Sequence, residues 1–114
     1  MHELSLARSI MDIIEEYDLR HHFKKVNSLK LSFGKLSSVE PSALEFAFEV
    51  LSKETKAEGA SLEFEVLPVI LYCTVCGENV SAEHYQATCP LCEGGEVCLA
   101  GGTEELKLLE LDVD

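Results

Sequence analysis

Two pairs of cysteines constrain this chain of 114 residues more than any other feature. Two residues separate Cys73 from Cys76, two separate Cys89 from Cys92, and twelve lie between the pairs. This short spacing lets both sulfurs of a pair point to one side of a tight turn, and two such turns facing each other form a closed tetrahedral S₄ site. The pattern predicts one structural Zn²⁺ ion bound by all four thiolates.

The alternatives to zinc are few. The interval of twelve residues is slightly shorter than the commonest zinc-ribbon spacing. Gly77 and Gly94 follow the two pairs and are expected to give the backbone freedom beside the metal. Four unrelated buried cysteines would not need this spacing. Iron in a rubredoxin-like site stays open, because S₄ geometry alone does not exclude it.

Two further side chains near the pairs could bind a metal. Cys98 lies six residues past Cys92 and has no partner in the sequence. We expect it to be a small buried hydrophobic side chain rather than a redox or metal-binding thiol. His84 lies between the pairs, and because four thiolates complete the shell, we expect it on the surface of a hairpin and not as a ligand.

Charge and hydropathy restrict the partners and the location. The formal net charge is −12, which repels nucleic acid and the anionic face of a membrane. The longest apolar stretch, Val66–Tyr72, is too short to span a bilayer. His2 and Glu3 stand where a signal peptide would carry lysines. We therefore expect a cytoplasmic protein with reduced cysteines and no disulfides.

Helical periodicity indicates two helices. In the first, the residues expected to face the core are Leu6, Ala7, Ile10, Ile13, Ile14 and Tyr17. The second opens at Pro41, with the Glu40 carboxylate facing the positive end of the helix dipole. Its expected core residues are Leu44, Ala47, Phe48 and Leu51, and Phe46 and Val50 suggest a second contact face.

Three segments have the alternation of strands: Leu29–Phe33, Leu62–Val66 and Glu104–Val113. In the last one the apolar residues change parity, which predicts a bulge near Leu108. The order of elements predicts an α+β fold, with two helices packed on a three-stranded sheet and an inserted Cys₄ zinc ribbon. We predict a zinc-binding domain at residues 70–97 and a discontinuous α/β domain at 1–69 plus 98–114.

The first residues offer a second set of metal donors. The imidazole and backbone nitrogen of His2 and the α-amino group of Met1 could bind one ion, and Glu3 could add a carboxylate. Nitrogen donors in tetragonal geometry suit Ni(II) or Cu(II) better than Zn(II). On the residues alone, the alternative is that His2 and Glu3 only begin a helix in water.

The succession of features along the chain is specific, although each feature alone is common. In order, they are Met1-His2-Glu3 followed by a helix, the strand ending at Gly34, the segment Val39-Glu40-Pro41-Ser42-Ala43-Leu44, Phe46, Phe48, Glu58-Gly59, the paired cysteines and a C-terminal strand. Together they resemble the HypA (HybF) family of nickel chaperones for [NiFe]-hydrogenase maturation. The resemblance covers essentially the whole chain.

The resemblance implies a function and its residues. HypA-like proteins take up Ni(II) at the extreme N-terminus and deliver it, with a GTPase partner called HypB, to the hydrogenase large-subunit precursor. The nickel histidine of the family falls on His2, the neighbouring carboxylate on Glu3, and an acidic ligand proposed in some members on Glu40. Its zinc ligands fall on the four paired cysteines. Zn²⁺ would then be structural and Ni²⁺ the cargo, in a monomer or weak homodimer.

Two departures from the family pattern concern the zinc module. Some members carry a histidine beside the cysteines that couples the zinc site to pH or nickel. Here those flanks are occupied by Gly77, Glu78, Glu93 and Gly94. We therefore do not expect a histidine-based switch. The stretch Glu93–Gly102 also looks looser than the family's usual approach to the last strand.

An enzymatic function is not expected. The sequence has no glycine-rich phosphate loop and no evident nucleophile and base, so any nucleotide hydrolysis would belong to a partner. The alternative functions are a zinc-ribbon adaptor or nucleic-acid-binding module, which the charge opposes, and an electron-transfer protein with iron at the S₄ site.

Overall fold

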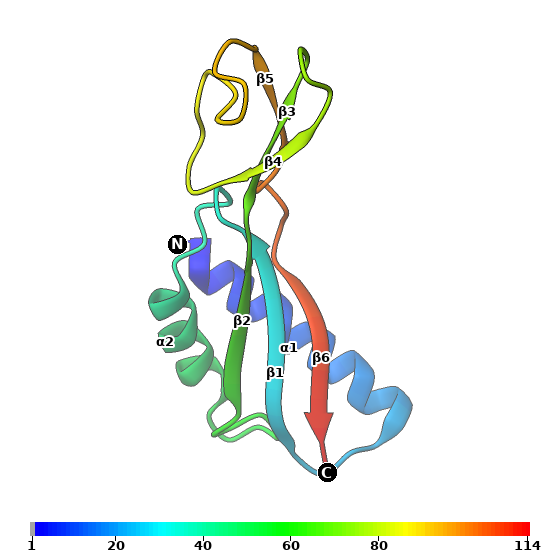
Figure 1. The fold of residues 1–114 in the computed structure, drawn as a ribbon. Coiled ribbons are helices and arrows are strands. Elements are labelled where there is room, and N and C mark those ends of the chain that lie inside the picture. Colours follow the sequence, from blue (N-terminus) through cyan, green and yellow to red (C-terminus); the bar gives the residue numbers. More distant parts are fainter. Residues whose placement is uncertain (1) are drawn as a thin grey trace. The chain divides into compact units, whose positions relative to one another are not determined.

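A computed structural model describes residues 2–114, and Met1 lies outside this range. Its elements are α1 (His2–His21), β1 (Val26–Gly34), α2 (Pro41–Ser52), β2 (Ser61–Leu67), β3 (Val69–Cys73), β4 (Asn79–Ala82), β5 (Val97–Gly101) and β6 (Lys107–Val113) (Figure 1). They form two compact units. Unit 1 comprises the described residues up to Ser32, with Val39–Glu65 and Leu106–Asp114; unit 2 comprises Phe33–Ser38 and Val66–Glu105.

Unit 1 is built around β1. The sheet order is β2-β1-β6, so β1 is the middle strand, and it pairs antiparallel with β6. Leu29 and Leu31 of β1 are almost wholly buried against apolar side chains of both helices. The remaining buried members of this core are Ala7, Ile10, Met11, Ile14, Phe23, Val26, Leu44, Ala47, Phe48 and Ala57. The predicted α+β fold, with two helices on a three-stranded sheet, is confirmed.

The buried face of α1 differs from the predicted one. The fully buried residues are Ala7, Ile10, Met11 and Ile14, at the i, i+3, i+4, i+7 spacing of a single helix face. Ile13 and Tyr17 are 37% and 39% exposed, so the prediction that they face the core is wrong. Periodicity predicts the spacing of the buried residues along a helix. Because α1 carries apolar residues on two adjacent faces, periodicity does not decide which of the two faces is buried.

The start of α2 follows the prediction. Pro41 is its first residue, and Glu40 is the N-cap, whose carboxylate accepts a 3.2 Å hydrogen bond from the Ser42 backbone N–H. This bond satisfies one of the donors that a helix N-terminus leaves free. On the opposite side of the helix from its buried stripe, Phe46 and Val50 are exposed.

The predicted bulge in β6 is present. Lys30 pairs with Glu110, but its neighbour Leu31 pairs with Leu108, so Leu109 has no partner on β1. The extra residue brings Leu108 and Leu111 to the same face of the sheet, where both pack on the core. The strand itself begins at Lys107, three residues later than predicted.

Unit 2 contains a second three-stranded sheet, with the order β4-β3-β5 and β3 antiparallel to both neighbours. The Glu93–Gly102 stretch is more regular than expected, because β5 lies within it. Cys98 is on β5 and is exposed, so the prediction that it is buried is wrong. The glycines that flank β5 hide its strand signal. They are needed for close packing, since a side chain at Gly95 would overlap Cys73 Sγ and one at Gly102 would crowd the Val69 backbone.

The predicted limits of a zinc-dependent domain, residues 70–97, concern folding and stay a prediction. Among the residues that the structure describes, no helix is both long and apolar enough to cross a membrane.

Replacing Leu31 by Ala should destabilise unit 1 by about 3 kcal/mol, because the side chain is fully buried in its middle strand. Denaturant unfolding followed by the helical circular dichroism signal measures this loss. Leu19→Ala is the matched control, since Leu19 is 77% exposed on α1, and it should change stability by less than about 0.5 kcal/mol. Equal losses in the two variants would contradict the core described above.

Candidate metal centre

The four paired cysteines converge in unit 2. Their Sγ atoms all lie within 4.8 Å of one another. The Sγ atoms of Cys73 and Cys92 are 3.7 Å apart, and those of Cys76 and Cys89 are 3.9 Å apart. Sulfurs about 2.3 Å from one ion, at the corners of a tetrahedron, would be about 3.8 Å apart. The donor set therefore fits a tetrahedral S₄ ion, and all four cysteines are free.

The first cysteine pair is shaped by the turn that ends β3. Cys73 is the last residue of the strand, and its carbonyl accepts a 2.9 Å hydrogen bond from Gly77 N–H. Gly77 has φ +71°, a left-handed conformation that favours glycine. The Cys76 N–H points to Cys73 Sγ at 3.4 Å, which is the charge-stabilising contact expected around a thiolate.

The second pair repeats this turn with one difference. Glu93 N–H donates to the Cys89 carbonyl at 2.8 Å, and Cys92 N–H to Cys89 Sγ at 3.5 Å. The residue with positive φ is Glu93, at +60°, and not Gly94 as expected. The equivalent residue of the first turn is Gly77. Because a positive φ is unfavourable for residues with a Cβ atom but not for glycine, the first turn is the less strained of the two.

The hydrogen bonds of the first turn shift the pKa values of its two cysteines in opposite directions. The Cys76 backbone N–H lowers the pKa of Cys73 to about 6. The hydrogen bond shared with Cys73 raises the pKa of Cys76 to about 12. These hydrogen bonds favour loss of the proton from Cys73 over loss from Cys76. An ion bound by both sulfurs requires both as thiolates, so binding weakens as pH falls.

The other two candidates in unit 2 lie apart from this cluster. His84 is exposed and is not among the ligand atoms that converge, as expected. Cys98 pairs in register with Tyr72 on β3, outside the cluster. Cys73 and Cys89 are buried while Cys76 and Cys92 are exposed. An ion held here would therefore have one side protected by the unit and the other near solvent.

The predicted N-terminal donors lie in unit 1, at the start of α1. His2 Nδ1 is 3.3 Å from Glu3 Oε2, and the same oxygen accepts a 3.4 Å hydrogen bond from the Glu40 backbone N–H. The Glu3 side chain is 16% exposed and that of His2 is 55% exposed. The backbone N–H of Glu3 and then the His2 side chain hold the pKa of the Glu3 carboxyl below its ordinary value. Glu3 is therefore a fixed anion beside an accessible imidazole.

The structure brings His2, Glu3 and Glu40 near one another but uses their groups differently. Glu40 contributes its backbone N–H to Glu3, while its carboxylate caps α2. Within residues 2–114, the cysteines are the one set of three or more ligand side chains already gathered around a point. Met1, the remaining predicted donor, lies outside the described residues.

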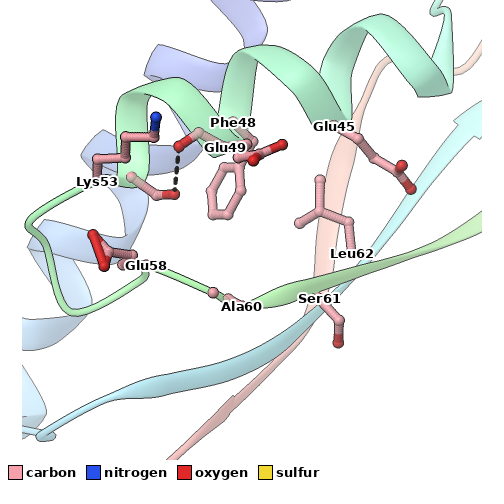
Figure 2. Close-up of a pocket in the computed structure, with 10 residues that line it drawn as sticks. Glu45, Phe48, Glu49, Lys53, Glu58, Ala60, Ser61 and Leu62 are labelled. Atoms are coloured by element: carbon pink, nitrogen blue, oxygen red, sulfur yellow. Dashed lines mark hydrogen bonds between the residues drawn. The ribbon is translucent and has the colours of Figure 1, made fainter.

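A cavity of about 680 Å³ lies elsewhere in unit 1, between α2 and β2 (Figure 2). Phe48 and Leu62 line it together with the carboxylates of Glu45, Glu49 and Glu58. None of the predicted metal ligands is among its lining residues. The metal candidates are therefore the exposed start of α1 and the cysteine cluster, not this cavity.

Comparison with known proteins identifies relatives over the full length. The family model "Hydrogenase/urease nickel incorporation, metallochaperone, hypA" matches residues 1–113. The chain is 57% identical over 114 residues to the hydrogenase maturation factor HypA of Syntrophus aciditrophicus (strain SB), covering 100% of both chains. It is 39% identical over 114 residues to the factor of the same name from Albidiferax ferrireducens, again covering 100% of both.

Solved structures show the same fold. A solution structure of HypA protein matches with a TM-score of 0.70 at 25% identity, covering 99% of this chain and 96% of that one. The solution structure of the Ni metallochaperone HypA from Helicobacter pylori matches with a TM-score of 0.62 at 22% identity, covering 97% and 96%.

Replacing Cys92 by Ser should remove bound zinc and disorder roughly residues 70 to 97, since a structural ion with one ligand missing no longer stabilises its fold. The helices of unit 1 should persist, because their core contains no cysteine. Elemental analysis after gel filtration and NMR amide dispersion measure the two effects.

Cys98→Ser is the matched control, because Cys98 is exposed and outside the cluster. It should keep one zinc per chain and an unchanged fold. Zinc retained at full stoichiometry in Cys92→Ser, or lost in Cys98→Ser, would refute this assignment of ligands.

Proposed function

Because this chain belongs to the HypA family of nickel metallochaperones for hydrogenase maturation, we propose that it binds Ni(II) at its N-terminus and helps insert it into the [NiFe]-hydrogenase large subunit. The observation that carries the proposal is the paired placement of His2 and Glu3 at the start of α1, with Glu3 tied to the residue that caps α2. The cargo would be held on donors that solvent and a receiving protein can both reach.

The donor chemistry supports nickel at this end. The His2 imidazole and backbone nitrogen and the α-amino group of Met1 would supply nitrogen ligands, which Ni(II) accepts in tetragonal geometry. Glu3 would add a negative charge beside them, because its carboxyl stays ionised at neutral pH. Glu40 would act mainly through Glu3, since its own carboxylate is the helix cap.

Zn²⁺ would have a structural role on the four cysteines. Four thiolates complete a tetrahedral shell and leave no position for a substrate. An ion at this site would hold the two cysteine turns together within unit 2. The nickel donors belong to unit 1 and the thiolates to unit 2, so each metal would have its own ligands.

The proposed partners are a HypB-like GTPase and the hydrogenase large-subunit precursor. The net charge of −12 favours partners that present basic surfaces to this chain. Delivery also requires that the cargo leave, and exposed donors of mixed type release an ion more readily than a closed thiolate shell.

His2→Ala should abolish specific Ni(II) binding while zinc content and the melting temperature stay the same. The reason is that His2 is exposed and has no part in the apolar core. Isothermal titration with Ni(II), run beside elemental analysis, measures both. His84→Ala, which removes another exposed histidine, should leave nickel affinity unchanged. Full nickel affinity in the His2 variant would exclude this site.

A protein that starts at Met1 can be compared with one carrying a short peptide ahead of Met1. The peptide turns the amine into an amide but keeps every side chain, so nickel affinity should fall at least about tenfold, with no change in unfolding. The same peptide added after Asp114 should have no effect. Equal affinities in all three proteins would show that the amine is not a ligand, whatever the part played by His2.

A further inference from the structure

The cysteines of the cluster in unit 2 differ in their exposure to solvent. Cys76 and Cys92, the second cysteine of each turn, are exposed, while Cys73 and Cys89, the first of each, are buried. Gly95 helps to shield Cys73, because a Cβ atom added at Gly95 would overlap the Cys73 Sγ. A solute that reacts with thiolates therefore meets Cys76 and Cys92 first.

Each exposed cysteine has its sulfur contact with a buried cysteine of the other turn. The Cys92 Sγ is 3.7 Å from the Cys73 Sγ, and the Cys76 Sγ is 3.9 Å from the Cys89 Sγ. Two sulfurs bond at about 2.0 Å, so each contact needs a further approach of less than about 2 Å to become a disulfide. The cluster thus contains two pairs that each combine an accessible sulfur with a protected one.

Both contacts are compatible with disulfides in the same molecule. In the sequence, the loop closed by the second contact lies wholly within the loop closed by the first, so the two bonds would be nested and would join the same two turns. The turns are also shaped by hydrogen bonds that use no sulfur, from Gly77 N–H to the Cys73 carbonyl and from Glu93 N–H to the Cys89 carbonyl. These backbone bonds would persist when the sulfurs pair.

We propose that the cysteine cluster is also an oxidation site, at which a peroxide converts the four thiolates into two disulfides, Cys73–Cys92 and Cys76–Cys89, with release of the bound ion. The disulfides would replace the ion in holding the two turns of unit 2 together. This proposal concerns the thiolates alone and does not depend on whether nickel binds at the N-terminus.

Each disulfide forms in two steps that use one molecule of hydrogen peroxide. The exposed Cys92 thiolate attacks one peroxide oxygen, the O–O bond breaks, and a sulfenic acid and a hydroxide ion form. The Cys73 thiolate then attacks the Cys92 sulfur, the S–O bond breaks, and a second hydroxide ion leaves as the S–S bond forms. The two thiolates together lose two electrons and the peroxide gains them. Cys76 and Cys89 would react in the same way with a second peroxide, after which no thiolate remains to bind the ion.

The test uses the zinc-loaded, full-length Cys98→Ser chain, in which the cluster holds the only thiols. After hydrogen peroxide is added, a chromophoric chelator should detect one zinc ion released per chain. Cleavage after glutamate residues yields the peptides 66–78 and 84–93, each of which carries the two cysteines of one turn. Mass spectrometry should find these two peptides joined, with four hydrogen atoms fewer than their sum, and fragment spectra after partial reduction should show the nested pairing.

The folded state of unit 2 provides an independent measurement. The oxidised, zinc-free chain should keep dispersed NMR amide signals for residues 70–97. Dithiothreitol with a chelator should collapse these signals, because neither an ion nor a disulfide then joins the turns. Dithiothreitol with zinc should instead restore the spectrum of the untreated protein.

Four outcomes would overturn the proposal. They are disulfides confined to single turns, which leave the two peptides separate; sulfinic acids in place of disulfides; zinc that stays bound in excess peroxide; and an oxidised chain in which unit 2 is disordered.

Discussion

Unit 2 depends on bringing four sulfur atoms within 4.8 Å of one another. Cys73 is placed by the end of β3, and the chain turns at Gly77 so that Cys76 returns to it. The N–H groups of each turn point to the first sulfur of the pair, as a bound cation with thiolate ligands requires. Outside the cysteines the buried apolar side chains of the small sheet are few, so a bound ion would supply stability that its core does not.

Unit 1 is stabilised by a hydrophobic core, and the position of this core leaves the proposed nickel donors outside the packed residues. Its core is mainly apolar, with Ser32 and Ser52 as buried polar residues, and the buried face of α1 begins only at Ala7. His2 and Glu3 precede that face, so binding or release of the proposed nickel ion there would not disturb the packing. Glu3 is nevertheless fixed by its bond to the Glu40 N–H. A chaperone of this family needs both properties, a defined site and an easy exit for its cargo.

Much of this arrangement could be predicted from the sequence, because the decisive signals are local. The cysteine spacing, the Glu40-Pro41 helix start and the change of parity in β6 each need only a few neighbouring residues. The errors come from features that depend on distant packing. Periodicity alone places the buried face of α1 too far toward Ile13 and Tyr17, since only the position of the strands decides between two adjacent apolar faces. β5 was missed because it is short, lies between glycines and is recognisable only through its pairing with β3.

The central claim is that two metals occupy two chemically distinct sites, thiolate sulfur for one and nitrogen and oxygen for the other. X-ray absorption at the zinc and nickel edges of protein loaded with both ions tests it most directly. The account predicts a zinc shell of four sulfurs at about 2.3 Å and a nickel shell without sulfur. Sulfur in the nickel shell, or nitrogen and oxygen in place of sulfur around zinc, would contradict it.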